Sequence, residues 1–184
     1  NGKPMKVHVA TTNMQNQIYI SEFYVGNPPQ KLRGVFDTGS TNTWVLNDKT
    51  KLFGDPKKEV CFHQDKSSSF KETKQEAEIF FGSGSLRGNF VVDDIRLGGC
   101  DEASGGLVHI KEQKFGNTAE ASTIFSGQNF EAIVGLAYPE LAEPGVTPLF
   151  DNMMQQKLLV SNMFAFFMLE TAEEEKHNWK PEMT

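Results

Sequence analysis

The stretch that decides the fold is LRGVFDTGSTNTWV, residues 32–45. An apolar run over residues 32–36 stops at Asp37, and a second β-like run begins at Thr43. β-branched and aromatic residues favour strands, whereas Asp and Gly favour tight turns. The stretch therefore predicts two strands joined by a short polar loop, with Asp37 where the first strand ends.

Working outward, the same reasoning predicts strands over residues 17–25, 76–81, 86–97, 107–115, 132–136 and 163–169. The sequence Gly-Ser-Gly-Ser at 82–85 predicts the glycine-rich tip of a long hairpin. Residues 47–70 and 170–176 are polar and are expected to form loops. Thr147 and Pro148 predict the start of a helix, because they suit the cap and the first helical position. The prediction is an all-β fold with one or two short helices.

The composition narrows the function classes. The chain has 184 residues, 38% hydrophobic and 23% charged, which suffices for a domain with a real core. The net charge is −6 without a basic cluster, so nucleic acid is not expected as a partner. No apolar run reaches the length of a membrane span. The chain begins with Asn, and a processed or trimmed chain without a signal peptide is expected.

Cysteine and histidine do not predict a metal centre. His63 lies two residues from Cys61, but no matching pair follows downstream, so neither a metal nor a cofactor is expected. Cys61 and Cys100 permit at most one internal disulfide.

Asp37 is the candidate catalytic residue, although an Asp beside a Gly usually serves only the turn. Its surroundings change that reading. The motifs occur in the order YVGNPPQ (24–30), VFDTGSTNTWV (35–45), Cys61 to SSSF (61–70), IFFGSGS (79–85), FEAIVGLAYP (130–139) and VTPLFDNMMQQKL (146–158). From residue 17 to residue 169 the chain resembles the N-terminal lobe of pepsin-like aspartic proteases, collinear throughout.

The resemblance implies a pepsin-like acid protease lobe. Residues 1–169 would be the N-terminal catalytic lobe and residues 170–184 an inter-lobe connecting segment, with the C-terminal lobe absent from this chain. The implied activity is aspartic endopeptidase activity, with water activated between Asp37 and a second Asp from that C-terminal lobe. Two carboxylates sharing one proton act as base and as acid in one reaction.

The resemblance also implies roles for the neighbouring residues. Thr38 and Gly39 would hold Asp37 through hydroxyl and backbone hydrogen bonds, and Ser40 would bond its outer oxygen. Trp44 would support the site. The flap and substrate-binding residues would be Phe81, Gly82, Ser83, Val35, Ile133, Ile124 and Phe125. For Ile124 and Phe125, a place in the pocket and a place in the core are equally open.

Three features depart from the family pattern. Phe81 replaces the usual flap Tyr that bonds the Trp numbered 44 here, and Glu131-Ala132 replaces Asp-Gly. Asp37 is also the only Asp followed by Thr/Ser-Gly. The usual disulfide partners of Cys61 and Cys100 are missing, so the two pair with each other or remain free.

Alternatives to a two-lobe protease remain open. A pseudoprotease or peptide-binding module would keep the cleft without turnover, and a homodimeric protease ranks lower because the chain already contains a whole lobe. The implied partners are a peptide or protein substrate, the C-terminal lobe and pepstatin-like inhibitors. The implied setting is the secretory pathway, with a vacuolar, lysosomal or secreted enzyme made as a zymogen.

Overall fold

The computed structural model describes residues 6–52, 60–81, 84–98, 107–122 and 127–184. It confirms an all-β fold with short helices. The strands are β1 (Val9–Met14), β2 (Ile18–Val25), β3 (Gln30–Asp37), β4 (Trp44–Leu52), β5 (Lys71–Phe81), β6 (Gly84–Leu97), β7 (Val108–Ala121), β8 (Ala132–Gly135), β9 (Phe166–Phe167) and β10 (Glu182–Met183). The helices are α1 (Leu149–Gln155) and α2 (Thr171–His177), with 3-10 turns η1 (Gln64–Lys66) and η4 (Pro139–Leu141).

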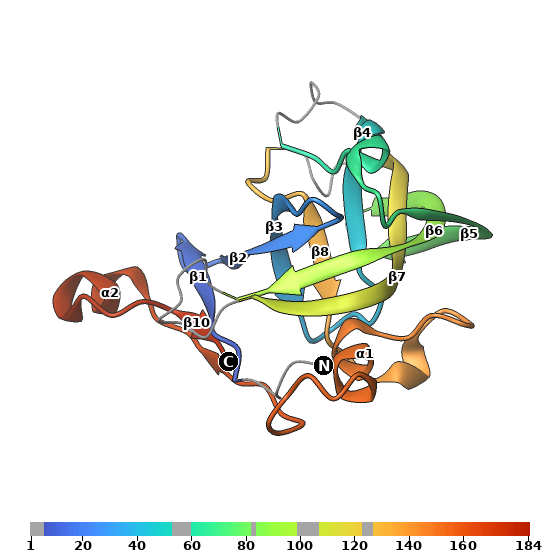
Figure 1. Ribbon diagram of the computed structural model, residues 1–184. Helices are drawn as coiled ribbons and strands as arrows, with labels where there is room; N and C mark the ends of the chain where they lie inside the picture. Colours follow the sequence, from blue (N-terminus) through green and yellow to red (C-terminus); the bar gives the residue numbers. More distant parts are fainter. Residues whose placement is uncertain (1–5, 53–59, 82–83, 99–106, 123–126) are drawn as a thin grey trace.

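Within these residues the strands form one sheet in the order β5-β6-β7-β4-β8-β3-β2-β1-β10-β9. An additional antiparallel pairing joins β2 to β6, where Tyr24 faces Arg96 and Val25 faces Ile95. The pairing closes the middle of the sheet into a barrel, while α2 projects to one side (Figure 1). All four residues of β8 are buried, which confirms the predicted central strand.

Two apolar clusters fill the structure. One lies within the barrel and includes Phe23, Leu32, Ile95, Ile110, Phe115 and Val134. The other joins strands β2, β4 and β8 to the β5–β6 hairpin. It includes Ile20, Trp44, Leu86, Phe90 and Ile133. Burying a large apolar side chain stabilises the fold by about 1.5–3 kcal/mol. These clusters hold β8 and its neighbours in place.

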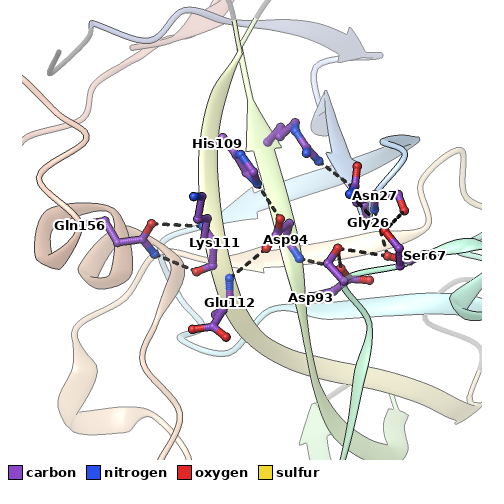
Figure 2. A network of polar contacts seen from close by, with 12 residues as sticks. Gly26, Asn27, Ser67, Asp93, Asp94, His109, Lys111, Glu112 and Gln156 are labelled. Carbon is purple, nitrogen blue, oxygen red and sulfur yellow. Dashed lines mark hydrogen bonds and ion pairs between the residues drawn. The ribbon is translucent and has the colours of Figure 1, made fainter. Parts of the chain in front are cut away.

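A polar network fastens residues 61–70 to β6 (Figure 2). The buried Asp93 accepts hydrogen bonds from Ser69 Oγ at 2.5 Å and from the Asp94 backbone at 2.8 Å. On the same strand Asp94 binds His109 Nε2 at 2.7 Å. Ser67 Oγ accepts the Asn27 backbone N–H at 2.9 Å. The loop preceding the hairpin is therefore held in a defined position.

The prediction that residues 47–70 are surface loop was wrong in part. Strand β4 continues to Leu52, and Phe62 is fully buried. An isolated parallel bridge joins Asn47 to Phe62, so this polar segment returns to the sheet. The apolar contacts of Phe62 with Phe70 and Phe115 outweigh the polar character of its neighbours.

The chain after α1 differs from the prediction as well. Residues 163–169 do not form a buried strand, because only Phe166 and Phe167 pair and Met163 is 72% exposed. Residues 170–176 are not a loop, because Glu170 caps helix α2 and the residues after it lie in the helix. Its acidic residues occupy the first turn and its basic residues the last, which favours a helix through its dipole.

The start of helix α1 and the first strand also differ from the prediction. Helix α1 begins at Leu149 with Pro148 as its cap, one residue later than the sequence predicts. Strand β1, which was not predicted, pairs with β2 and β10. Among the described residues, no helix is long and apolar enough to cross a membrane.

Candidate active site

Asp37 lies at the last position of β3, opposite Gly135 of β8 in a parallel pairing. Strands β3 and β4 follow one another in the chain, yet both pair with β8. The loop between them therefore crosses the end of β8. The Leu136 N–H donates to the Asp37 carbonyl at 2.8 Å and the Ala137 N–H to the Ser40 carbonyl at 2.9 Å, which fixes the loop from its two ends.

A close backbone approach explains the glycine that ends β8. A Cβ atom on Gly135 would lie 2.8 Å from the Asn42 nitrogen and closer still to the Thr41 carbonyl. Backbone atoms cannot move aside as the end of a side chain can. Glycine at position 135 therefore lets the loop carrying Asp37 lie against β8.

Of the hydrogen bonds expected to the Asp37 carboxylate, the structure contains the one from Gly39 but not the one from Ser40. Its Oδ1 accepts the Gly39 N–H at 2.9 Å, which confirms the expected backbone bond. The expected bond from Ser40 is not formed, because Ser40 Oγ is buried without a hydrogen-bond partner in the described part of the chain. Thr38 is exposed, and its supporting role stays a prediction.

The predicted pocket residues that can be placed lie together. Trp44 and Ile133 are buried in one apolar cluster, and Val35 packs against it. Ile79 and Leu86 bring both strands of the β5–β6 hairpin to the same cluster. The hairpin, β3, β4 and β8 thus converge beside the loop of Asp37.

Other predicted site residues cannot be placed. Gly82, Ser83, Ile124 and Phe125 lie outside the described residues. Phe81 pairs with Gly84 through its backbone, and its side chain is outside the description. Cys100 is outside it too, so pairing with Cys61 stays an expectation.

The indole of Trp44 is deeply buried. Trp44 is 1% exposed, and its Nε1 has no hydrogen-bond partner among the described residues. This agrees with the sequence expectation that Phe81, which lacks a hydroxyl, cannot bond the indole. A buried donor without a partner costs about 1–3 kcal/mol.

Sequence reasoning missed an ion pair on the strand that leads to Asp37. Glu131 is fully buried, and its Oε2 accepts the Arg33 N–H at 3.1 Å and the Arg33 Nε at 3.2 Å. Its Oε1 accepts Arg33 Nη2. The side-chain hydrogen bond to Glu131 raises the pKa of Arg33. The signal in the sequence was the departure from Asp-Gly at 131–132, but nothing local connects it to Arg33.

Comparison with known proteins agrees with this arrangement. The family described as eukaryotic aspartyl protease matches residues 18–178. The chain belongs to the eukaryotic aspartyl protease family. The match includes β2 to α2 and therefore the whole Asp37 loop, the hairpin strands and β8.

Individual aspartyl proteases give the extent of the similarity. Cathepsin D of Homo sapiens is 36% identical over 166 residues, which cover 85% of this chain and 39% of the relative. Cathepsin D of Bos taurus is 36% identical over 164 residues, covering 85% and 41%. Plasmepsin IX of Plasmodium falciparum (isolate NF54) is 32% identical over 170 residues, covering 89% and 26%. The chain thus spans well under half the length of these aspartyl proteases.

Proposed function

We propose that this chain is the N-terminal lobe of an aspartic endopeptidase, in which Asp37 supplies one of two catalytic carboxylates. The observation that carries the proposal is the position of Asp37. It ends a central strand, one carboxylate oxygen accepts the Gly39 N–H, and its loop is fixed against β8. Membership of the aspartyl protease family supports this reading.

The chemistry needs a second carboxylate. Hydrolysis of an amide requires a base that activates water and an acid that protonates the leaving nitrogen. Two adjacent carboxylates share one proton because both cannot ionise at close range, and together they serve both roles. Asp37 provides one, and an Asp of a C-terminal lobe provides the other.

The hairpin β5–β6 acts as the flap. Its tip at residues 82–83 closes over the substrate peptide, excludes water and offers backbone hydrogen bonds. Val35, Trp44 and Ile133 line the pocket for the residue before the cleaved bond. Their apolar cluster with Ile79 and Leu86 supports a preference for a large apolar side chain.

An apolar surface supports the docking of a second lobe. Val160 is 67% exposed, and Met163 and Met168 are exposed beside it in sequence. A pocket of about 340 Å³ lies between β1, α1 and residues 159–165, and its lining is mainly apolar. Strand β9 is the edge strand of the sheet formed by the described residues. A monomeric protein rarely leaves large apolar patches uncovered, so we assign this face to the C-terminal lobe.

The direct test is peptide cleavage across pH by the full-length protein and by this chain alone. The full-length protein is expected to cleave at acidic pH with a bell-shaped profile, and the isolated chain to be inactive. Asp37→Asn is expected to lower kcat by roughly a thousandfold or more, because loss of one member of a catalytic unit removes most of its rate. Asp151→Asn, which changes another half-buried Asp, serves as the matched control and should keep activity.

Each alternative has its own outcome. Binding of a pepstatin-like inhibitor without any cleavage would make the protein a pseudoprotease. Cleavage by a dimer of the isolated chain would favour the homodimeric enzyme, and cleavage by a monomer would overturn the two-lobe account. A secretory, vacuolar or lysosomal location is part of the proposal, and imaging of the tagged full-length protein checks it.

A further inference from the structure

Three side chains that can bind a metal ion gather away from the Asp37 loop. Asp48 of β4, His63 and Asp65 of η1 each offer one ligand atom, and these atoms lie within 4.8 Å of one another. They form the one such group in the part of the chain that the structure describes. The proposed peptidase mechanism uses none of the three.

One distance within the group is compatible with two ligands of the same metal ion. His63 Nδ1 lies 3.4 Å from Asp48 Oδ2. Two atoms that each lie about 2.1 Å from a tetrahedral zinc ion are about 3.4 Å apart. A hydrogen bond from a ring nitrogen to an oxygen is usually shorter, about 2.7–3.2 Å. Ordinary histidine–carboxylate pairs in this structure have similar distances, such as 3.3 Å between His177 Nε2 and Glu173 Oε2, so the third group, Asp65, is what sets this cluster apart.

The backbone that carries these residues is fixed from both sides. The Asp48 N–H donates to the Phe62 carbonyl at 3.1 Å, beside the Asn47–Phe62 bridge. The Gln30 side chain accepts the His63 N–H at 2.8 Å and donates to the His63 carbonyl at 2.9 Å. Lys66 N–H also bonds that carbonyl, which holds the turn of Asp65. Because the backbone is already ordered, an ion that binds does not have to order it. Such preorganisation lowers the entropic cost of binding.

One carboxylate oxygen of Asp48 is also buried. Asp48 Oδ1 is buried, and no hydrogen bond to it is formed by the residues described. Buried carboxylate oxygens in folded proteins are normally paired, and an unpaired one is costly. The oxygen that faces His63 is the other one, Oδ2, so a cation offsets that cost only when both oxygens of Asp48 bind it.

We propose that Asp48, His63 and Asp65 bind a divalent transition-metal ion, with Zn²⁺ as the best fit. An imidazole nitrogen selects zinc-like ions over Ca²⁺ and Mg²⁺, which take oxygen ligands. Three protein ligands leave a fourth position for water. The ion ties β4 to the segment that precedes the flap. Sequence patterns do not reveal the group, because Asp48 and His63 are separated in the chain and are brought together by the pairing of Asn47 with Phe62.

The test is a zinc titration of the full-length protein in competition with a chromophoric chelator. One equivalent is expected to bind. His63→Ala is expected to weaken binding at least tenfold, since even the loss of a residue that only supports a ligand costs 10–100-fold. Asp65 is exposed, so Asp65→Asn should weaken binding without disturbing the fold. Zinc at a hundred times its Kd should raise the Tm of the unmodified protein by about 3 °C, the shift for a protein as long as the relatives. It should have little effect on the Tm of Asp65→Asn.

A matched control separates this site from ordinary histidine–carboxylate pairs. His177 Nε2 lies 3.3 Å from Glu173 Oε2 in α2, and no third ligand group is recognised there among the described residues. His177→Ala and Asp37→Asn are both expected to keep the zinc equivalent. Absence of saturable binding, or binding unchanged in His63→Ala and Asp65→Asn, would overturn the proposal. Equal affinity for Ca²⁺ would overturn the choice of metal. None of these outcomes bears on the role of Asp37.

Discussion

The two ends of strand β8 differ in how their polar groups are satisfied. Just before the strand, the buried Glu131 accepts three hydrogen bonds from Arg33, and its backbone bonds Arg33 and Leu46. Beyond its other end lies the loop of Asp37 and the start of β4. There Ser40 Oγ, Thr43 Oγ1 and Trp44 Nε1 are buried without partners in the described structure.

The difference separates scaffold from site. Folded proteins rarely leave buried donors and acceptors unpaired, because each costs about 1–3 kcal/mol. At the Glu131 end, both oxygens of the buried carboxylate accept hydrogen bonds from Arg33. At the Asp37 end, three buried polar groups beside the candidate catalytic loop have no partner among the described residues.

The largest expected effect is a loss of stability at the Glu131 end of β8, where the polar groups are paired. Glu131→Ala removes a fully buried carboxylate and leaves Arg33 without its partner. We expect a loss of about 2–4 kcal/mol, somewhat below the range for completely buried pairs because the Arg33 side chain is 38% exposed. Chemical denaturation of the full-length protein measures it. Glu22→Ala breaks the exposed pair with Lys31 and should cost under about 1 kcal/mol. Equal losses in both variants would refute the contrast between a buried and an exposed pair.

The next largest effect is expected at the Gly135 end of β8, where the Asp37 loop lies against the strand. In Gly135→Ala the new methyl group meets the backbone of Thr41 and Asn42, so the Asp37 loop must shift. We expect a cost of about 1–3 kcal/mol. The fall in kcat/KM should be about a hundredfold, as for a 1 Å displacement of a catalytic group.

The control for this variant is Gly34→Ala on β3. There the new methyl group meets the side chains of Phe23 and Val134, at 3.0 and 3.3 Å, and side chains can adjust. Activity should stay within a few-fold of the unmodified protein. If Gly135→Ala were as active as Gly34→Ala, the loop of Asp37 would not depend on its contact with β8.

The smallest expected effect concerns the unpaired indole. Phe81→Tyr supplies the hydroxyl that the family resemblance places beside Trp44, a hydrogen bond worth about 1 kcal/mol net. Peptidase activity should remain within about tenfold, because a flap positions the substrate and does not transfer the proton. Hydrogen exchange of residues 76–90 should slow. A loss of several orders of magnitude would show that the phenyl ring has another role.

Local patterns predicted the part of the molecule built from consecutive residues. The strand ending in Asp37, the hairpin and the buried strand β8 follow from apolar runs that stop at Gly or Asp. The bond from Gly39 to Asp37 follows in the same way, since the two residues are neighbours in one turn.

Contacts between distant residues could not be predicted. Glu131 and Arg33 are joined only by the pairing of β3 with β8. Phe62 is buried through partners on other strands, although the residues around it are polar. The exposed Met163, Phe167 and Met168 belong to a stretch that resembles a core strand in sequence, because hydrophobicity alone does not say whether a partner covers a residue.

The insertion of β8 between β3 and β4 fixes the order in which the lobe can assemble. About a hundred residues separate Asp37 from Gly135, and the chain entropy of closing such a loop must be overcome before the two strands meet. Folds rich in such long-range pairings fold slowly. The flap hairpin, by contrast, pairs neighbouring segments and can form early. In a growing or refolding chain the Asp37 loop therefore reaches its position against β8 only after the chain extends through Gly135.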